Sequence, residues 1–157
     1  RNSSAASDVY KRQIQMIFQD PYESLNPRWT IKDIIKEPLD IHNIGNLAER
    51  EDTIIEILRT VGLTPPENYL SRYPHEISGG QRQRVSIART LVMKPKFVIC
   101  DEPTSMLDVS IRISIMDLML NLAKELEVSY LYITHDPAVA RYMCDRIAVM
   151  FLSLIHI

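Results

Sequence analysis

The sequence predicts an α/β fold, in which a parallel sheet carries helices on both faces and a helical subdomain precedes most of the sheet. Two apolar runs, residues 97–100 and 129–134, lack the polar alternation of half-exposed strands and are typical of buried parallel strands. A long amphipathic pattern over residues 109–126 separates them, as a crossover helix would. The 157 residues, 46% hydrophobic and 24% charged, suffice for one globular domain with a buried core.

The first half of the chain is predicted to be mainly helical. A short strand is expected over residues 14–18, followed by a loop over residues 21–27 because prolines bound that segment. One helix is expected over residues 30–38, where a proline ends it. A second helix is predicted over residues 47–61, on an apolar stripe made of Ile54, Ile55, Leu58 and Val61.

The second half alternates helices with apolar strands, which is the pattern of a parallel sheet. Helices are predicted over residues 78–93, 109–126 and 137–143. Strands are predicted over residues 97–100, 129–134 and 146–150.

Both ends of the sequence carry segments that we expect to be foreign to the protein. Residues 8–13 and 152–157 can be encoded by the two strands of one short DNA, which protein physics does not explain and which resembles a translated transposon-end adaptor. We therefore expect residues 1–13 and 152–157 to be non-native and the protein to be truncated at its N-terminal side. The remaining chain is expected to comprise a loop-bearing segment over 14–29, a helical subdomain over 30–94 and an α/β core over 95–151.

The charge balance makes a nucleic-acid partner unexpected. Lys and Arg number 18 against 20 Asp and Glu, and the balance becomes more acidic without the two end segments. Proteins that bind polyanions through phosphate contacts carry the opposite excess. No signal peptide or membrane-spanning segment is expected either, because the longest apolar run, at the C-terminal end, is too short to cross a bilayer.

Glycine is scarce, with four residues in the whole chain. None of them is spaced to form a GxxxxGK[ST] phosphate loop or a GxGxxG dinucleotide fingerprint. A nucleotide enzyme complete within this sequence is therefore not expected.

Polar residues follow three of the predicted strands at their carboxyl ends, where open parallel sheets bind ligands. Gln19 follows the first strand, Asp101 and Glu102 the second, and His135 the third. An acidic pair after an apolar strand has the form that presents a carboxylate to Mg²⁺ in phosphate-loop NTPases. Asp101 is the candidate for the metal, through water, and Glu102 the candidate for polarising an attacking water. Taken alone, this pair is equally consistent with a strand followed by a helix N-cap.

The turn at residues 78–81 favours the nucleotide interpretation. Ser78 is a good N-cap, and Gly79 and Gly80 allow backbone N–H groups at a helix start to approach an anion. The helix dipole adds positive potential there, so phosphate is a natural ligand. A capped helix without a ligand would need neither adjacent glycines nor Gln81.

Taken together, these motifs resemble the nucleotide-binding subunits of ABC transporters. Residues 77–81 resemble the family signature, with Ile77 where Leu is commoner, and Gln19 matches the Q-loop. Residues 97–102 match the Walker B strand, residues 105–108 the D-loop with Met106 where Ala is usual, and His135 the switch histidine. The five motifs occur in family order across residues 14–150.

The resemblance implies a phosphate-loop NTPase-like core and a head-to-tail pair of ATPase domains that hold two ATP molecules between them. One domain would supply its phosphate loop with Asp101, Glu102, Gln19 and His135. The other would supply Ser78, Gly79, Gly80 and Gln81, with Asp108 communicating across the pair. The implied cofactors are ATP and Mg²⁺, the metal being held by Asp101 and Gln19. Because the phosphate loop is missing, we expect this chain alone to be inactive.

Within the family, residues 18–28 and 73–76 are similar to those of oligopeptide and dipeptide importer ATPases of bacteria. The implied partners are a homologous ATPase subunit and membrane permease subunits, which would bind through the Q-loop and the helical subdomain. The implied location is peripheral, at the cytoplasmic side of the cell membrane. Import of nickel or glutathione, and an ABC ATPase outside transport that serves DNA repair or translation, remain alternatives.

Overall fold

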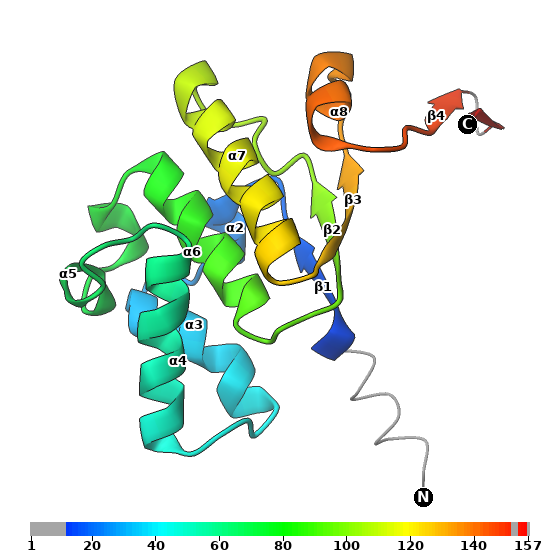
Figure 1. Cartoon of the computed structure of the whole chain (residues 1–157). Helices are drawn as coiled ribbons and strands as arrows, with labels where there is room; N and C mark the ends of the chain where they lie inside the picture. Colours follow the sequence, from blue (N-terminus) through cyan, green and yellow to red (C-terminus); the bar gives the residue numbers. More distant parts are fainter. Residues whose placement is uncertain (1–11, 152–153, 157) are drawn as a thin grey trace, which may run out of the picture.

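A computed structural model describes residues 12–151 and 154–156 of the chain (Figure 1). Three parallel strands form a sheet in the order β1-β2-β3, and most of the helices precede β2. The elements are β1 (Ile14–Ile17), α2 (Pro21–Ser24), α3 (Ile31–Ile41), α4 (Leu47–Thr60), α5 (Glu67–Leu70), a 3₁₀ turn (Pro74–Glu76), α6 (Gly79–Leu91), β2 (Phe97–Asp101), α7 (Val109–Glu125), β3 (Ser129–Ile133), α8 (Pro137–Met143), β4 (Val149–Phe151) and β5 (Leu154–His156). The predicted α/β fold with a parallel sheet and a helical subdomain is confirmed.

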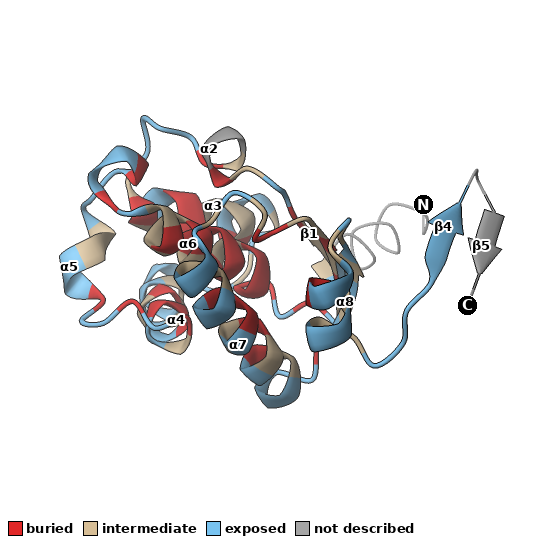
Figure 2. Ribbon diagram, turned by 90° about the horizontal axis from the view of Figure 1, so that it is seen from above, coloured by how far each residue is buried: buried red, intermediate tan, exposed pale blue. Residues whose placement is uncertain are grey.

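The two faces of the sheet differ in burial. Val98 and Cys100 of β2 are fully buried, together with Ile17, the partner of Cys100 in β1. On the opposite face, Leu131 and Ile133 of β3 are 49% and 45% exposed. Among the described residues, the helices therefore cover the first face much more fully than the second (Figure 2).

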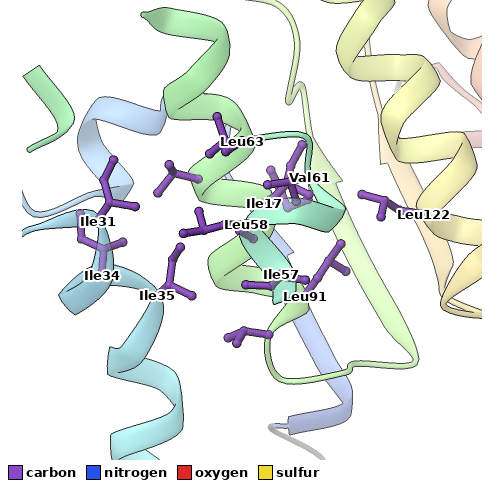
Figure 3. Packing of buried hydrophobic residues seen from close by; sticks show 14 of the residues in the cluster. Ile17, Ile31, Ile34, Ile35, Ile57, Leu58, Val61, Leu63, Leu91 and Leu122 are labelled. Carbon is purple, nitrogen blue, oxygen red and sulfur yellow. The ribbon is translucent and has the colours of Figure 1, made fainter. Parts of the chain in front are cut away.

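The helical subdomain consists of α3 to α6, and each of its long helices begins with a capping box. The side chain of Thr30 caps α3, that of Asn46 caps α4 and that of Ser78 caps α6. Each cap satisfies backbone N–H groups that a helix start leaves unpaired. Side chains from these three helices, from β1, from the turn after α4 and from α7 (Val109–Glu125) meet in one apolar cluster (Figure 3). Its labelled members are Ile17, Ile31, Ile34, Ile35, Ile57, Leu58, Val61, Leu63, Leu91 and Leu122.

Helix α6 joins the helical subdomain to the sheet. It contacts α3 and α4 on one side and β1 and α7 on the other. The side chain of Arg84 links α6 to two neighbouring helices. Its guanidinium donates a hydrogen bond of 2.5 Å to the Val61 carbonyl at the end of α4 and one of 3.0 Å to Ser114 Oγ of α7. The turn at the start of α6 is thereby fixed relative to the strand ends.

Helix α3 continues through Pro38 to Ile41, so the predicted end at the proline was wrong. The proline cannot donate a backbone hydrogen bond in this turn, which weakens the helix. The continuation buries Leu39, which is 2% exposed, and burial of a leucine side chain contributes about 2 kcal/mol. Burial of Leu39 offsets part of the cost of the proline, about 3 kcal/mol, and the bond from the His42 N–H to the Pro38 carbonyl continues the helical pattern.

Two further expectations need correction. Residues 21–27 begin with the short helix α2, because a proline at the first helical position loses no bond that the helix would use. The last strand spans Val149–Phe151 and pairs antiparallel with Leu154–His156 instead of joining the parallel sheet. Most of the end segments expected to be non-native, residues 1–11, 152–153 and 157, lie outside the described residues.

Candidate functional site

Gln19, Glu102 and His135 follow β1, β2 and β3, and the structure brings their side chains together. The parallel register places the three strand ends at one edge of the sheet. The carboxylate of Glu102 accepts a hydrogen bond from Gln19 Nε2 at 3.3 Å and lies 2.7 Å from Nδ1 of His135. The structure thus brings three of the predicted site residues together, and their roles toward a nucleotide stay a prediction.

The backbone of Glu102 is unusual. Its φ is 43°, in the left-handed region that costs a residue with a Cβ on the order of 1 kcal/mol. Its N–H donates 3.0 Å to the carbonyl of Ile133, so the residue is anchored to the neighbouring strand in this conformation. Strain of this kind persists where the surrounding structure imposes it, and it is frequent at active sites.

The His135 ring is exposed and close to a carboxylate. Its side chain is 77% exposed, whereas that of Glu102 is 23% exposed. The hydrogen bond to Glu102, followed by the charge of that carboxylate, raises the pKa of His135 above its ordinary value. With Nδ1 bonded to Glu102, Nε2 is the ring atom left to meet a ligand.

We expect the pKa of His135 to be higher in the nucleotide-free protein than in the Glu102→Gln variant, because the variant removes the carboxylate charge. The attraction between imidazolium and carboxylate is complete below the ordinary histidine pKa and disappears as the pH rises through the elevated one. NMR titration of the ring protons, with His135→Gln to assign the resonance, measures both values. An unchanged pKa in the Glu102→Gln variant would contradict the contact.

Asp101 ends β2 next to Glu102 and is partly exposed. Among the described residues, no three His, Cys, Asp or Glu side chains gather as a metal cage. Such a cage is not needed for Mg²⁺, which keeps several waters and takes one or two carboxylates together with phosphate oxygens. The donor set fits this pattern, because Asp101 is a carboxylate at the strand end and Gln19, which donates through Nε2 to Glu102, leaves its carbonyl oxygen Oε1 as an acceptor.

The turn that carries Ser78, Gly79, Gly80 and Gln81 is a separate feature at the start of α6. Ser78 Oγ accepts 3.3 Å from the Gln81 N–H, and the Gln81 side chain accepts 3.0 Å from the Ser78 N–H. Among the described residues, none of the hydrogen bonds of this turn reaches Gln19, Glu102 or His135. Gly79 is half-exposed, while Gly80 is buried.

Gly80 has a packing role that the sequence did not reveal. A Cβ at this position would lie 2.7 Å from Cγ2 of Ile111 in α7. A Cβ on Gly79 would make only ordinary contacts, the nearest at 3.8 Å. Of the two glycines, Gly80 is required by close helix packing and Gly79 is open to a ligand.

Two polar side chains at the loop over residues 102–108 were not assigned to the site from the sequence: Ser105 within the loop and Arg112 in α7. Ser105 Oγ donates 3.0 Å to the Glu102 carbonyl and accepts a long hydrogen bond of 3.4 Å from Gln19 Nε2. Arg112 of α7 donates to carbonyls of the same loop. The neighbouring Asp108 is exposed and its side chain makes no cap bond to α7. No sequence motif could single out Arg112, because its role depends on how the loop folds over α7.

The chain is similar in sequence to known ATP-binding transport proteins. The family model described as "ABC transporter" matches residues 2–105. The chain is 52% identical to the oligopeptide transport ATP-binding protein OppF of Bacillus subtilis, over 92% of this chain and 47% of the relative. It is 50% identical to the dipeptide transport ATP-binding protein DppF of Lactococcus lactis, over 90% of this chain and 45% of the relative.

The chain is also similar to a glutathione import protein and to a solved ATP-binding cassette. The chain is 50% identical to the glutathione import ATP-binding protein GsiA of Pectobacterium atrosepticum, over 96% of this chain and 24% of the relative. A dimeric, post-hydrolysis structure of the ATP-binding cassette MJ0796 bound to ADP and Pi superposes with a TM-score of 0.72 at 30% identity. That match covers 91% of this chain and 61% of the other, and the chain spans less than half the length of the curated relatives it matches. Within the described residues, no helix combines the length and apolar character that a membrane crossing requires.

Proposed function

Since this chain belongs to the ABC transporter family, we propose that the whole protein is the ATP-binding subunit of an importer that couples ATP hydrolysis to uptake of peptides. The observation that carries the proposal is the contact of Gln19 and His135 with one glutamate, Glu102, at the carboxyl edge of the sheet. The peptide substrate is supported by the oligopeptide and dipeptide transport proteins that the chain resembles at about 50% identity.

In the proposed reaction, Glu102 orients the attacking water and accepts its proton, for which the carboxylate must be ionised. The carboxylate of Glu102 accepts hydrogen bonds from the amide of Gln19 and the imidazole of His135, which fix its orientation. As the imidazolium, whose two ring nitrogens both donate, His135 would donate from Nε2 to the terminal phosphate and keep that group in line with the water. Mg²⁺, held by Asp101 and Gln19, would neutralise phosphate charge when bound.

A second ATPase domain would complete each site. Ser78, Gly79, Gly80 and Gln81 begin a helix whose N–H groups and dipole suit a phosphate, yet within the described part of the chain none of their hydrogen bonds joins Glu102. In the proposed head-to-tail pair, this turn faces the nucleotide of the partner domain, with Asp108 near the contact. The structure of the ATP-binding cassette MJ0796 with ADP and Pi is dimeric, which supports a pair of this kind.

A membrane permease subunit is proposed to bind in the groove between the Q-loop segment and the helical subdomain. The segment after Gln19 borders a cavity of about 270 Å³, which α3 and α6 close from the other side. An ion pair of 2.7 Å between Glu37 and Arg89 lies at its wall, and Trp29 at its rim is 38% exposed. A groove with an aromatic rim and a charged wall suits an amphipathic helix. This contact would hold the ATPase at the cytoplasmic side of the membrane.

We propose that the chain is one part of that ATPase and is inactive alone. It contains no phosphate-loop motif, and it spans 47% of a relative such as OppF. The half-exposed apolar face of the sheet, with Leu131 and Ile133, is consistent with a further segment packing there. ATP and Mg²⁺ binding with turnover are therefore properties proposed for the whole protein.

The substrate is tested by uptake in cells that lack the whole protein. Labelled tri- and tetrapeptides, glutathione and nickel are offered separately, and uptake is compared before and after the gene is restored. We expect restored uptake of peptides only, and Glu102→Gln should fail to restore it. Recovery of glutathione uptake without peptide uptake would instead support glutathione import, the function that the name of GsiA states, at 50% identity to the chain.

A further inference from the structure

Arg112, in the first turns of α7, holds the loop that carries the proposed catalytic glutamate. Its Nε donates 3.2 Å to the carbonyl of Thr104, and its Nη2 lies 3.4 Å from the carbonyls of Ser105 and Leu107. One planar guanidinium therefore binds three carbonyl groups within four successive residues. Arginine suits this task because its donors form a rigid fork.

The loop held in this way is in direct contact with Glu102. The N–H and Oγ of Ser105 donate 3.1 Å and 3.0 Å to the Glu102 carbonyl. The same Oγ accepts the long bond from Gln19 that was described above. Ser105 contacts Arg112, Glu102 and Gln19, so this single residue links Arg112 to each of the other two.

Arg112 also reaches the loop that carries the histidine. Its Nη1 lies 4.0 Å from Oδ2 of Asp136, the residue that follows His135. The other carboxylate oxygen of Asp136 caps α8 by accepting 2.9 Å from the Ala138 N–H, so this loop is fixed on both sides. The Arg112 side chain is 27% exposed, and it lines a cavity of about 60 Å³ together with Glu102 and His135.

We propose that Arg112 is a positioning residue, which holds the Glu102 loop and the His135 loop in the mutual geometry that hydrolysis requires. The inference rests on the proposed ATPase function. Arg112 binds none of the reacting groups itself, and it acts through Ser105 on Glu102 and through Asp136 on His135. A misplacement of catalytic groups by about 1 Å costs on the order of a hundredfold in rate, and partial loosening costs less.

The test is a double-mutant cycle on the whole protein, with single-turnover ATP hydrolysis as the readout. Arg112→Gln is expected to lower the rate about tenfold in the parent and less than about twofold in a background that carries both Glu102→Gln and His135→Gln, because it acts through those two residues. The KM for ATP is expected to change less than about twofold, since positioning affects the reacting step. Arg112→Lys keeps the charge with fewer donors, and it should give an intermediate rate.

Lys124→Gln is the matched control, since it removes one charge from the exposed end of the same helix. It should leave the rate unchanged. If Arg112→Gln lowers the hydrolysis rate by the same factor in both backgrounds, the role of Arg112 is merely structural. If it leaves the rate of the parent unchanged, Arg112 does not position the loops. Either result overturns the inference. Failure of the unsubstituted protein to hydrolyse ATP would instead overturn the proposed function.

Discussion

Replacement of Glu102 by Gln is expected to lower kcat for ATP hydrolysis by about 10²- to 10⁴-fold in the whole protein, because the amide cannot accept a proton from water. The side chain keeps its size, and Gln19 and His135 can still contact its carbonyl oxygen. ATP binding should therefore persist, with the KM for ATP changed less than about threefold. Steady-state hydrolysis and equilibrium ATP binding, measured on the same preparation, check both expectations.

Glu125→Gln is the control for this experiment. It makes the same chemical change at an exposed position in the last turn of α7, remote from the strand ends. We expect it to leave both kcat and KM unchanged. Hydrolysis at the parent rate by the Glu102→Gln variant would exclude Glu102 as the base.

Replacement of Gly80 by Ala is expected to lower the free energy of unfolding by about 1–3 kcal/mol, the usual cost of an overpacked site. The new Cβ would lie 2.7 Å from Cγ2 of Ile111, and a β-branched side chain on a helix has little freedom to move away. Denaturant titration of the whole protein measures the loss.

Two matched variants separate this steric effect from others. Gly79→Ala places a methyl group in ordinary contact only, so its unfolding free energy should stay the same or rise slightly, as helix propensity favours alanine. Ile111→Ala removes Cγ2, and in that background Gly80→Ala should cost nothing or stabilise. A loss of equal size in both backgrounds would show that Ile111 is not the obstacle.

The sequence could predict the catalytic edge because parallel strands impose it. Once residues 14–18, 97–100 and 129–134 were identified as parallel strands, their carboxyl ends had to share one edge, and with them Gln19, Glu102 and His135. The start of α6 at Ser78 could also be predicted from the sequence, because the capping serine and the two glycines are adjacent along the chain.

What the sequence could not predict depends on contacts between distant segments. Pro38 alone indicates a helix end, whereas the burial of Leu39 in the folded core, which favours the continuation of α3, depends on distant segments. The role of Arg112 arises because α7 folds back along the loop over residues 102–108. Gly80 was interpreted from its neighbours as a ligand-approach glycine, whereas its burial follows from the crossing of α6 and α7.

The central claim is that one ATP site is formed by the strand-end residues of one domain and the Ser78 turn of another. The most direct test is a crystal structure of the whole protein, as the Glu102→Gln variant, grown with ATP and Mg²⁺. The account predicts a terminal phosphate beside His135 and residue 102, with Ser78 and Gly79 of a second ATPase domain on its other side. A nucleotide bound away from His135, or a Ser78 turn that contacts no nucleotide in such a complex, would contradict it.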